Sequence, residues 1–239
     1  MFSFRFNDYL FFFILFFIAL SIIASNISIS KLWGAEGQTF SLFEFFSPLP
    51  AAFLGPAYGI LVVLIAKGFA ILFSPTPFNL TTFLRFIPPI VGAYIFSKFK
   101  ENFFNSVLNS LICFICIGLF IFHPVGSKAW LFSIFWFIPI ALNFVKSNHI
   151  FFRALATTLT QHAVGGVIWI YFVSPANPEF WLALIPLVAI ERLVFASGIA
   201  LSYLGSLRVF NFFNNFVLLR YFRKTAVFVP YLEKQKKKN

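Results

Sequence analysis

Residues 154–173 read ALATTLTQHAVGGVIWIYFV and residues 180–204 read FWLALIPLVAIERLVFASGIALSYL, and the short turn SPANPE at 174–179 joins these two apolar runs. A helix needs about 20 predominantly apolar residues to cross the hydrocarbon core of a bilayer, and both runs have that length. The pattern predicts two antiparallel transmembrane helices that form a hairpin.

Polar residues occur in both runs where a membrane-spanning helix tolerates them least. Gln161 and His162 lie near the middle of the first run, and Glu191 and Arg192 lie near the middle of the second. His162 and Glu191 are about equally far from the turn, so at a rise of roughly 1.5 Å per residue they reach a similar depth. An ionisable residue at mid-membrane costs about 2.5–3.5 kcal/mol on insertion scales and usually faces a partner or a water-filled cavity.

These four residues therefore predict a shared polar cavity, which is the candidate functional site. Thr158 precedes His162 by one helical turn and shares its face. Glu191 and Arg192 are adjacent, so their side chains leave the helix about 100° apart and are expected to have different partners. The structural alternative is a polar clamp, in which each of these groups only bonds a neighbouring helix.

The composition of the whole chain is that of a membrane protein. Of its 239 residues, 60% are hydrophobic, 10% are charged and 40 are Phe, which a water-soluble domain could not bury. Apolar segments recur at residues 9–29, 49–73, 80–96, 105–122, 130–145, 154–173 and 180–204. Their length indicates helices rather than alternating strands. We expect an all-α, polytopic transmembrane helical bundle of six to seven spans over residues 1–206, followed by an interfacial amphipathic helix and a basic tail over residues 207–239.

The distribution of basic residues predicts an orientation. The formal net charge is +11, and much of it lies in the C-terminal tail. Cytoplasmic loops carry an excess of Lys and Arg, so the C-terminus and the turns near residues 98–100 and 146–153 are expected inside. The turns at 74–79 and 174–179 contain neither residue type and are expected outside. The tail favours anionic lipid over nucleic acid, and the chain suits a prokaryotic plasma membrane.

Two further cations are candidates for the same cavity. Lys67 and Arg85 each lie about six residues from the ends of the turn at 74–79, so they reach a similar depth in the predicted outer half. At one level they could bind an anionic group of a ligand. The alternative is that both side chains extend to the membrane interface.

Helix-breaking residues interrupt two of the apolar segments. Gly55-Pro56 and Gly59 lie in the second segment, and Pro88-Pro89 lie in the third. Such residues free backbone groups that protein or cavity water must satisfy, so we expect kinks beside a cavity. Asn143, in the fifth segment, faces either a ligand or a neighbouring helix.

The sequence contains no specific catalytic motif. The nucleophile elbow, the metalloprotease H-E-x-x-H pattern and the phosphate-binding loop are all absent. Cys113 and Cys116 are the only cysteines and lack the further ligands of a zinc site, so they are expected to pack in the core. Neither a metal nor a cofactor is expected.

The run FFSPLPAAFLGPAYGI at 45–60, followed by Arg85 and by PPIVG at 88–92, resembles the membrane-embedded substrate-binding S components of energy-coupling-factor vitamin transporters. In that family a Gly-Pro and a nearby Gly occur in a helix that follows a long gating loop. The resemblance covers roughly residues 47–96, and the Gly55-Pro56-x-x-Gly59 helix and the preceding stretch 31–48 carry it. It implies a small binder of a vitamin or similar micronutrient that docks on a transmembrane scaffold and two cytoplasmic ATPases.

Three function hypotheses follow from the sequence. The first is a solute-binding membrane subunit for micronutrient uptake, energised by a separate ATPase module, in which the ligand contacts Lys67, Arg85, Asn143, Gln161, His162, Glu191 and Arg192. The second is an intramembrane enzyme acting on a lipid or isoprenoid, with His162 and Glu191 as an acid–base pair. The third is an assembly protein in which the polar residues only join helices.

Overall fold

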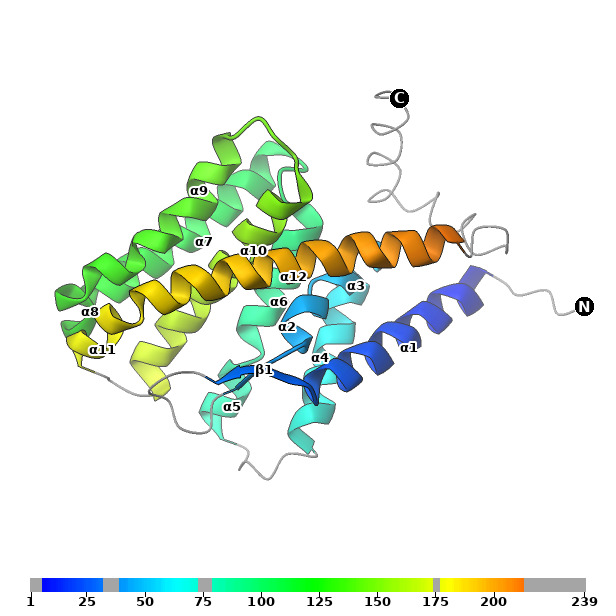
Figure 1. The fold of residues 1–239 in the computed structure, drawn as a ribbon, viewed down its shortest axis with the longest axis horizontal. Helices are drawn as coiled ribbons and strands as arrows, with labels where there is room; N and C mark the ends of the chain where they lie inside the picture. Colours follow the sequence, from blue (N-terminus) through cyan, green and yellow to red (C-terminus); the bar gives the residue numbers. More distant parts are fainter. Residues whose placement is uncertain (1–5, 32–38, 73–78, 174–176, 213–239) are drawn as a thin grey trace, which may run out of the picture.

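The computed structural model describes residues 6–31, 39–72, 79–173 and 177–212, which form a bundle of helices with one small sheet (Figure 1). Along the chain the elements are α1 (Phe6–Ser25), β1 (Ser28–Lys31), β2 (Thr39–Ser41), α2 (Phe43–Phe46), α3 (Leu49–Leu54), α4 (Pro56–Leu72), α5 (Leu80–Leu84), α6 (Ile87–Lys98), α7 (Phe103–Phe122), α8 (Pro124–Lys128), the 3-10 helix η1 (Trp130–Trp136), α9 (Phe137–Phe144), α10 (Ile150–Ile168), the π-helical turn η2 (Trp169–Val173), α11 (Pro178–Ala183) and α12 (Ile185–Phe212).

The described residues are 86% helical, which confirms the all-α class. Within the described part of the chain, three helical stretches are long and apolar enough to cross a membrane, namely Leu80–Lys98, Phe103–Phe122 and Ile185–Phe210, and further apolar helices are shorter. The predicted count of six to seven spans stays a prediction. Residues 207–212 continue α12, and the rest of the predicted interfacial helix and basic tail lies outside the described residues.

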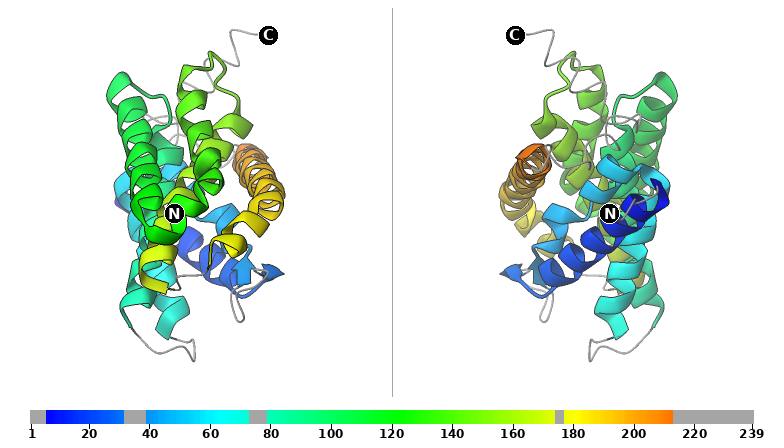
Figure 2. Two further views of the ribbon diagram at one scale, coloured as in Figure 1. Left: turned by 90° about the vertical axis from the view of Figure 1, so that its left-hand side faces the viewer. Right: turned by 90° about the vertical axis from the view of Figure 1, so that its right-hand side faces the viewer.

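Helix α10, the first half of the predicted hairpin, is the centre of the bundle. It packs against α6, α12, α7 and α9, with α12 on one side and α7 and α9 on another (Figure 2). Its polar residues Thr157, Thr158, Thr160 and Gln161 are buried between these helices. Gly92 of α6 permits close contact, because a Cβ there would overlap the side chain of Gln161. The helix that sequence reading places in the membrane is therefore surrounded by protein.

The second apolar segment is two helices rather than one kinked span. Gly55, with a φ of +85°, ends α3, and Pro56 begins α4. Glycine adopts this backbone conformation without the steric cost that a Cβ imposes, and proline suits the first position of a helix. The chain folds back here, since a Cβ on Gly59 would overlap the backbone of Ala51. The breakers predicted to kink a helix instead reverse the chain.

The third apolar segment and the stretch 31–48 also consist of more than one element. Pro88 and Pro89 lie in the first turn of α6, where proline costs no hydrogen bond. A new helix therefore begins here, and residues 85–86 separate it from α5. In the predicted gating stretch 31–48, β1 and β2 pair antiparallel and α2 follows, while residues 32–38 lie outside the described residues. The sequence did not predict this strand pair.

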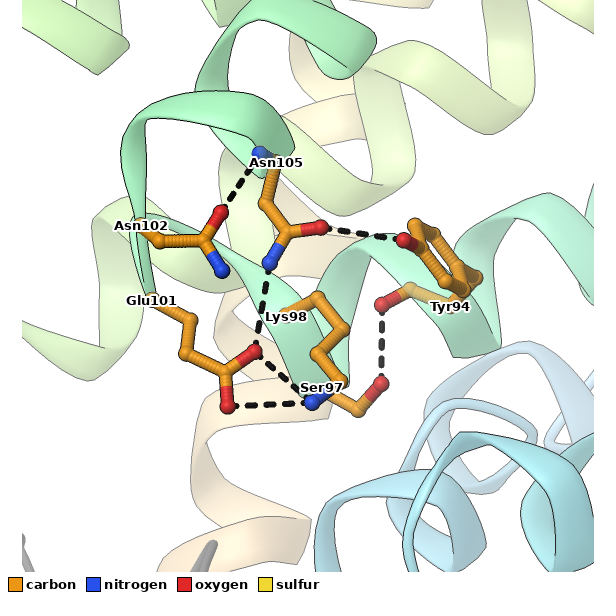
Figure 3. Close-up of polar contacts among 6 residues, drawn as sticks. All are labelled: Tyr94, Ser97, Lys98, Glu101, Asn102 and Asn105. Atoms are coloured by element: carbon orange, nitrogen blue, oxygen red, sulfur yellow. Dashed lines mark hydrogen bonds and ion pairs between the residues drawn. The ribbon is translucent and has the colours of Figure 1, made fainter.

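The turn between α6 and α7 is held by a network of polar side chains (Figure 3). The Tyr94 hydroxyl donates to Asn105 Oδ1 at 2.9 Å, and Asn105 Nδ2 donates to Glu101 Oε2 at 3.2 Å. The Lys98 ammonium forms an ion pair with Glu101 Oε2 at 2.7 Å. Asn102 caps α7, because its Oδ1 accepts from the backbone N–H of Asn105 at 2.9 Å.

The two basic turns lie together at this end of the bundle. Lys100 Nζ donates to the backbone carbonyls of Val145 and Ser147, so the turn after α6 contacts the turn after α9. Sequence reading places both turns on one side of the membrane, and their contact agrees with that placement. The turns at 74–79 and 174–179 lie largely outside the described residues.

Candidate functional site

A cavity of about 300 Å³ lies at the other end of α6, between α4, α6, α10, α11 and α12. Its volume is at the lower limit of the roughly 300–1,000 Å³ typical of small-molecule sites. Pro88 and Pro89 in the first turn of α6 line the cavity, whereas Lys98 in the last turn belongs to the basic end. The second half of α10, from Gln161 onward, also lines it, while α10 begins near the basic turns.

Six of the seven predicted ligand contacts line this cavity: Lys67, Arg85, Gln161, His162, Glu191 and Arg192. The seventh, Asn143, lies elsewhere. Its Nδ2 donates to Ser110 Oγ at 2.8 Å and to the Ser106 carbonyl at 3.1 Å, so it joins α9 to α7. Of the predicted gating or kink residues, Pro88 and Pro89 line the cavity, and Gly55, Pro56 and Gly59 do not.

Glu191 and Arg192 contact each other, contrary to the prediction that they have different partners. Arg192 Nη2 lies 3.4 Å from Glu191 Oε2, and Nη1 donates to Thr158 Oγ1 at 3.3 Å. The guanidinium lies over the rings of Phe40, at 5.4 Å, and Phe195, at 4.5 Å. A long, flexible arginine side chain overcomes the 100° separation at the backbone, and the aromatic rings contribute cation–π attraction.

His162 is fixed by a hydrogen bond to the 3-10 helix. Trp136 is fully buried, and its indole Nε1–H donates to His162 Nδ1 at 3.0 Å. A neutral imidazole that accepts at Nδ1 carries its proton on Nε2 and is a donor there. His162 therefore presents a hydrogen-bond donor, and its lone acceptor site is already occupied.

Five polar atoms on residues that line the cavity are buried without a hydrogen-bond partner in the part of the chain that the structure describes. They are Gln161 Nε2, Trp169 Nε1, Trp181 Nε1, Arg192 Nε and Glu191 Oε1. A buried donor or acceptor left unpaired costs about 1–3 kcal/mol, and more when it is charged. So many unpaired groups around one cavity are typical of a site completed by a ligand or by bound water.

Sequence reasoning missed the aromatic part of the wall. Trp169 from η2 and Phe180 and Trp181 from α11 line the cavity together with Phe132 from η1 and Phe40 from β2. The signal available was weak, because aromatic residues make up 22% of the chain and occur throughout its apolar segments. Only the two tryptophans carry an N–H that demands a partner when buried.

The cationic part of the wall comes from α4 and from the break between α5 and α6. The Lys67 ammonium lies 4.5 Å from the centroid of the Phe43 ring, and Arg85 is exposed at the end of α5. Glu44 of α2 lines the same cavity. Within the described ranges neither cation forms an ion pair.

The described residues hold no cluster of three or more His, Cys, Asp or Glu side chains that could bind a metal ion. Cys113 and Cys116 are free thiols buried among α7, η1 and α10, where Cys113 Sγ lies 3.6 Å from Thr160 Oγ1. Both lie outside the lining of the cavity.

The chain was also compared with known proteins. No protein-family model, no curated protein and no solved structure matches it.

Proposed function

We propose that this protein is a membrane-embedded subunit that binds a small molecule in the cavity and serves its uptake. The observation that carries the proposal is the set of five buried, unpartnered polar atoms on residues that line one partly open cavity between helices. Residues that only join helices usually have their buried polar atoms paired. Here the pairing is incomplete, and a ligand with its own polar atoms would complete it.

The position of the cavity supports uptake from outside the cell. The basic turns near residues 98–100 and 146–153 occupy one end of the bundle, and the cavity occupies the other. Because Lys and Arg accumulate in cytoplasmic loops, we infer a multi-pass protein of a prokaryotic plasma membrane with the cavity toward the outside and the C-terminus in the cytoplasm. The basic tail would then contact anionic lipid.

The energy for uptake would come from other subunits. The sequence has no nucleotide-binding loop, so this chain by itself has no recognisable means of hydrolysing ATP. We infer that it works with a separate ATPase module through a transmembrane scaffold, as the resemblance to the S components implies. The ligand would then be a vitamin-like micronutrient.

Acid–base catalysis on a lipid fits the same geometry less well. A general base needs a free lone pair within reach of its substrate, and the acceptor site of His162 is taken by Trp136. Glu191 is held in an ion pair with Arg192, although its Oε1 is free. We infer binding rather than catalysis for this cavity.

The proposal is tested by native mass spectrometry of the protein purified in mild detergent, followed by extraction and identification of any retained molecule. Arg85→Gln removes an exposed cation of the cavity wall and is expected to leave the melting temperature unchanged. Ligand retention should fall by about tenfold or more, which is the effect of one lost charged hydrogen bond. Arg208→Gln, an exposed arginine of α12 outside the cavity lining, is the matched control and should retain the ligand. Equal retention in both variants would reject this site.

A further inference from the structure

We propose that the ligand is a small, flat monoanion whose polar atoms are mostly hydrogen-bond acceptors, such as an aromatic carboxylate. This inference rests on the proposed binding function and concerns only the chemical class of the ligand. Three properties of the cavity wall lead to it: the kind of unpaired polar atoms, the balance of charges and the aromatic lining.

The unpaired polar atoms of the wall are mainly donors. Gln161 Nε2, Trp169 Nε1, Trp181 Nε1 and Arg192 Nε each carry a hydrogen without an acceptor among the described residues, whereas Glu191 Oε1 is a single unpaired acceptor. Gln161, Trp181, Glu191 and Arg192 are more than nine-tenths buried, so bulk water does not pair them. The Nε2–H of His162 adds a further donor. The complementary molecule presents several acceptors and one donor.

The charges of the wall leave one positive charge in excess. Arg192 and Glu191 neutralise each other as an ion pair. Lys67 and Arg85 then remain opposite one acid, Glu44, and His162 is neutral with its proton on Nε2. A ligand with a single negative charge would balance this wall, because a charge that enters a low-dielectric cavity needs an opposite charge nearby.

The two cations and the two tryptophans come from different elements. Lys67 belongs to α4 and Arg85 follows α5, while Trp169 belongs to η2 and Trp181 to α11. Trp181 packs edge-on to Phe132, with the ring centroids 4.8 Å apart. Aromatic walls favour a flat unsaturated body through stacking and edge contacts. An anionic group beside the cations and a ring beside the tryptophans would satisfy both parts of the wall.

The test measures the binding of four matched probes to the full-length protein in lipid nanodiscs by calorimetry, with empty nanodiscs as the blank. The probes are quinoline-3-carboxylate, its neutral carboxamide, the quinolin-3-ylmethylammonium cation and the saturated decalin-2-carboxylate. We expect the quinoline carboxylate to bind about 10- to 100-fold more tightly than the carboxamide, the range expected for one charged hydrogen bond. The cation should not bind, and the saturated acid should bind less tightly than the flat one.

Two variants place the charge preference in the cavity. Lys67→Gln should reduce the preference for carboxylate over carboxamide, and Lys128→Gln, at an exposed lysine of α8 outside the cavity lining, should leave it unchanged. Preference for the cation, the amide or the saturated acid would overturn the inference, and so would the failure of all four probes to bind. Native mass spectrometry of the same preparation separates the two proposals. A retained neutral or cationic molecule contradicts only the ligand class, whereas the absence of both retained molecule and probe binding contradicts the binding function as well.

Discussion

The two ends of α6 hold polar side chains in opposite states. At its C-terminal end Tyr94, Lys98, Glu101 and Asn105 bond one another in a closed network, shown in Figure 3. At its N-terminal end the cavity is surrounded by polar side chains with unpaired atoms, of which Gln161 lies directly against α6. Polar residues are equally evident in the sequence at both ends. Only the pairing of their atoms separates a structural turn from a candidate binding site.

The comparison leads to an expectation for mutations. A polar group with full partners contributes to folding and should cost stability when it is removed. An unpaired buried group already lowers stability, so its removal should cost little or even stabilise the fold while it impairs binding. The ion pair between Glu191 and Arg192 lies between these cases, because each residue is both partnered and partly unpaired.

The largest expected effect is at this ion pair. Arg192→Met removes the cation and leaves the buried Glu191 carboxylate without its partner, so we expect the free energy of unfolding to fall by about 3–5 kcal/mol. The measurement is thermal or denaturant unfolding in detergent, read by tryptophan fluorescence. The double variant E191L/R192M removes both charges and should recover most of the lost stability, since replacement of a buried ion pair by apolar residues is often neutral.

Binding separates the two roles of this pair. The double variant is expected to fold and yet to retain no ligand, because it lacks the unpaired Arg192 Nε–H and Glu191 Oε1 of two residues that line the cavity. Full ligand retention in a stable double variant would show that the pair only joins the helices.

A second effect, of intermediate size, compares two buried amides. Asn105 is 7% exposed and Gln161 is 6% exposed, but Asn105 bonds Tyr94 and Glu101 through its side chain while Gln161 Nε2 is unpaired. Asn105→Leu should cost roughly 2–3 kcal/mol, since two hydrogen bonds are lost and the Tyr94 hydroxyl is left without its acceptor. Gln161→Leu should leave the free energy of unfolding equal or higher and should weaken ligand retention. Unfolding curves and native mass spectra of both variants make the comparison.

Two outcomes would contradict the contrast between the two ends of α6. If Gln161→Leu destabilised the protein as much as Asn105→Leu, the Gln161 amide would be part of the packing between α6 and α10. If Asn105→Leu abolished ligand retention without loss of stability, the turn would have a role in binding.

The sequence predicted that α10 and α12 meet, because the depth of a residue in a membrane helix follows from its distance along the chain from the turn. Helical rise is constant, so residues equally far from a short turn reach the same level, and His162 and Glu191 do line one cavity. The same count placed Lys67 and Arg85 at a similar depth, and both line the cavity. The sequence also placed the basic turns on one side of the membrane, because the Lys and Arg content of a loop can be read directly from the sequence.

The remaining features depend on information that is not local. The pairing of Glu191 with Arg192 depends on side-chain conformation, and the donor set of Trp169 and Trp181 depends on which aromatic rings turn inward. Asn143 has the chemistry of a ligand contact, but its Nδ2 donates to Ser106 and Ser110 of α7, outside the cavity. Gly55 signalled a break, but whether a helix bends or the chain reverses is decided by what packs behind it.

The smallest expected effect tests the closed network at its exposed edge. Glu101→Gln removes the ion pair with Lys98. The side chain of Lys98 is 25% exposed and that of Glu101 is 43% exposed. Exposed ion pairs contribute at most about 1 kcal/mol, so the free energy of unfolding should change by less than that at low salt. The difference should vanish at about 1 M salt, where the screening length falls to roughly 3 Å. A larger loss of unfolding free energy that does not depend on salt would contradict this expectation. It would show that Glu101 acts mainly through the hydrogen bond that it accepts from Asn105 Nδ2, so that the ordered turn, and not the ion pair, stabilises this end of α6.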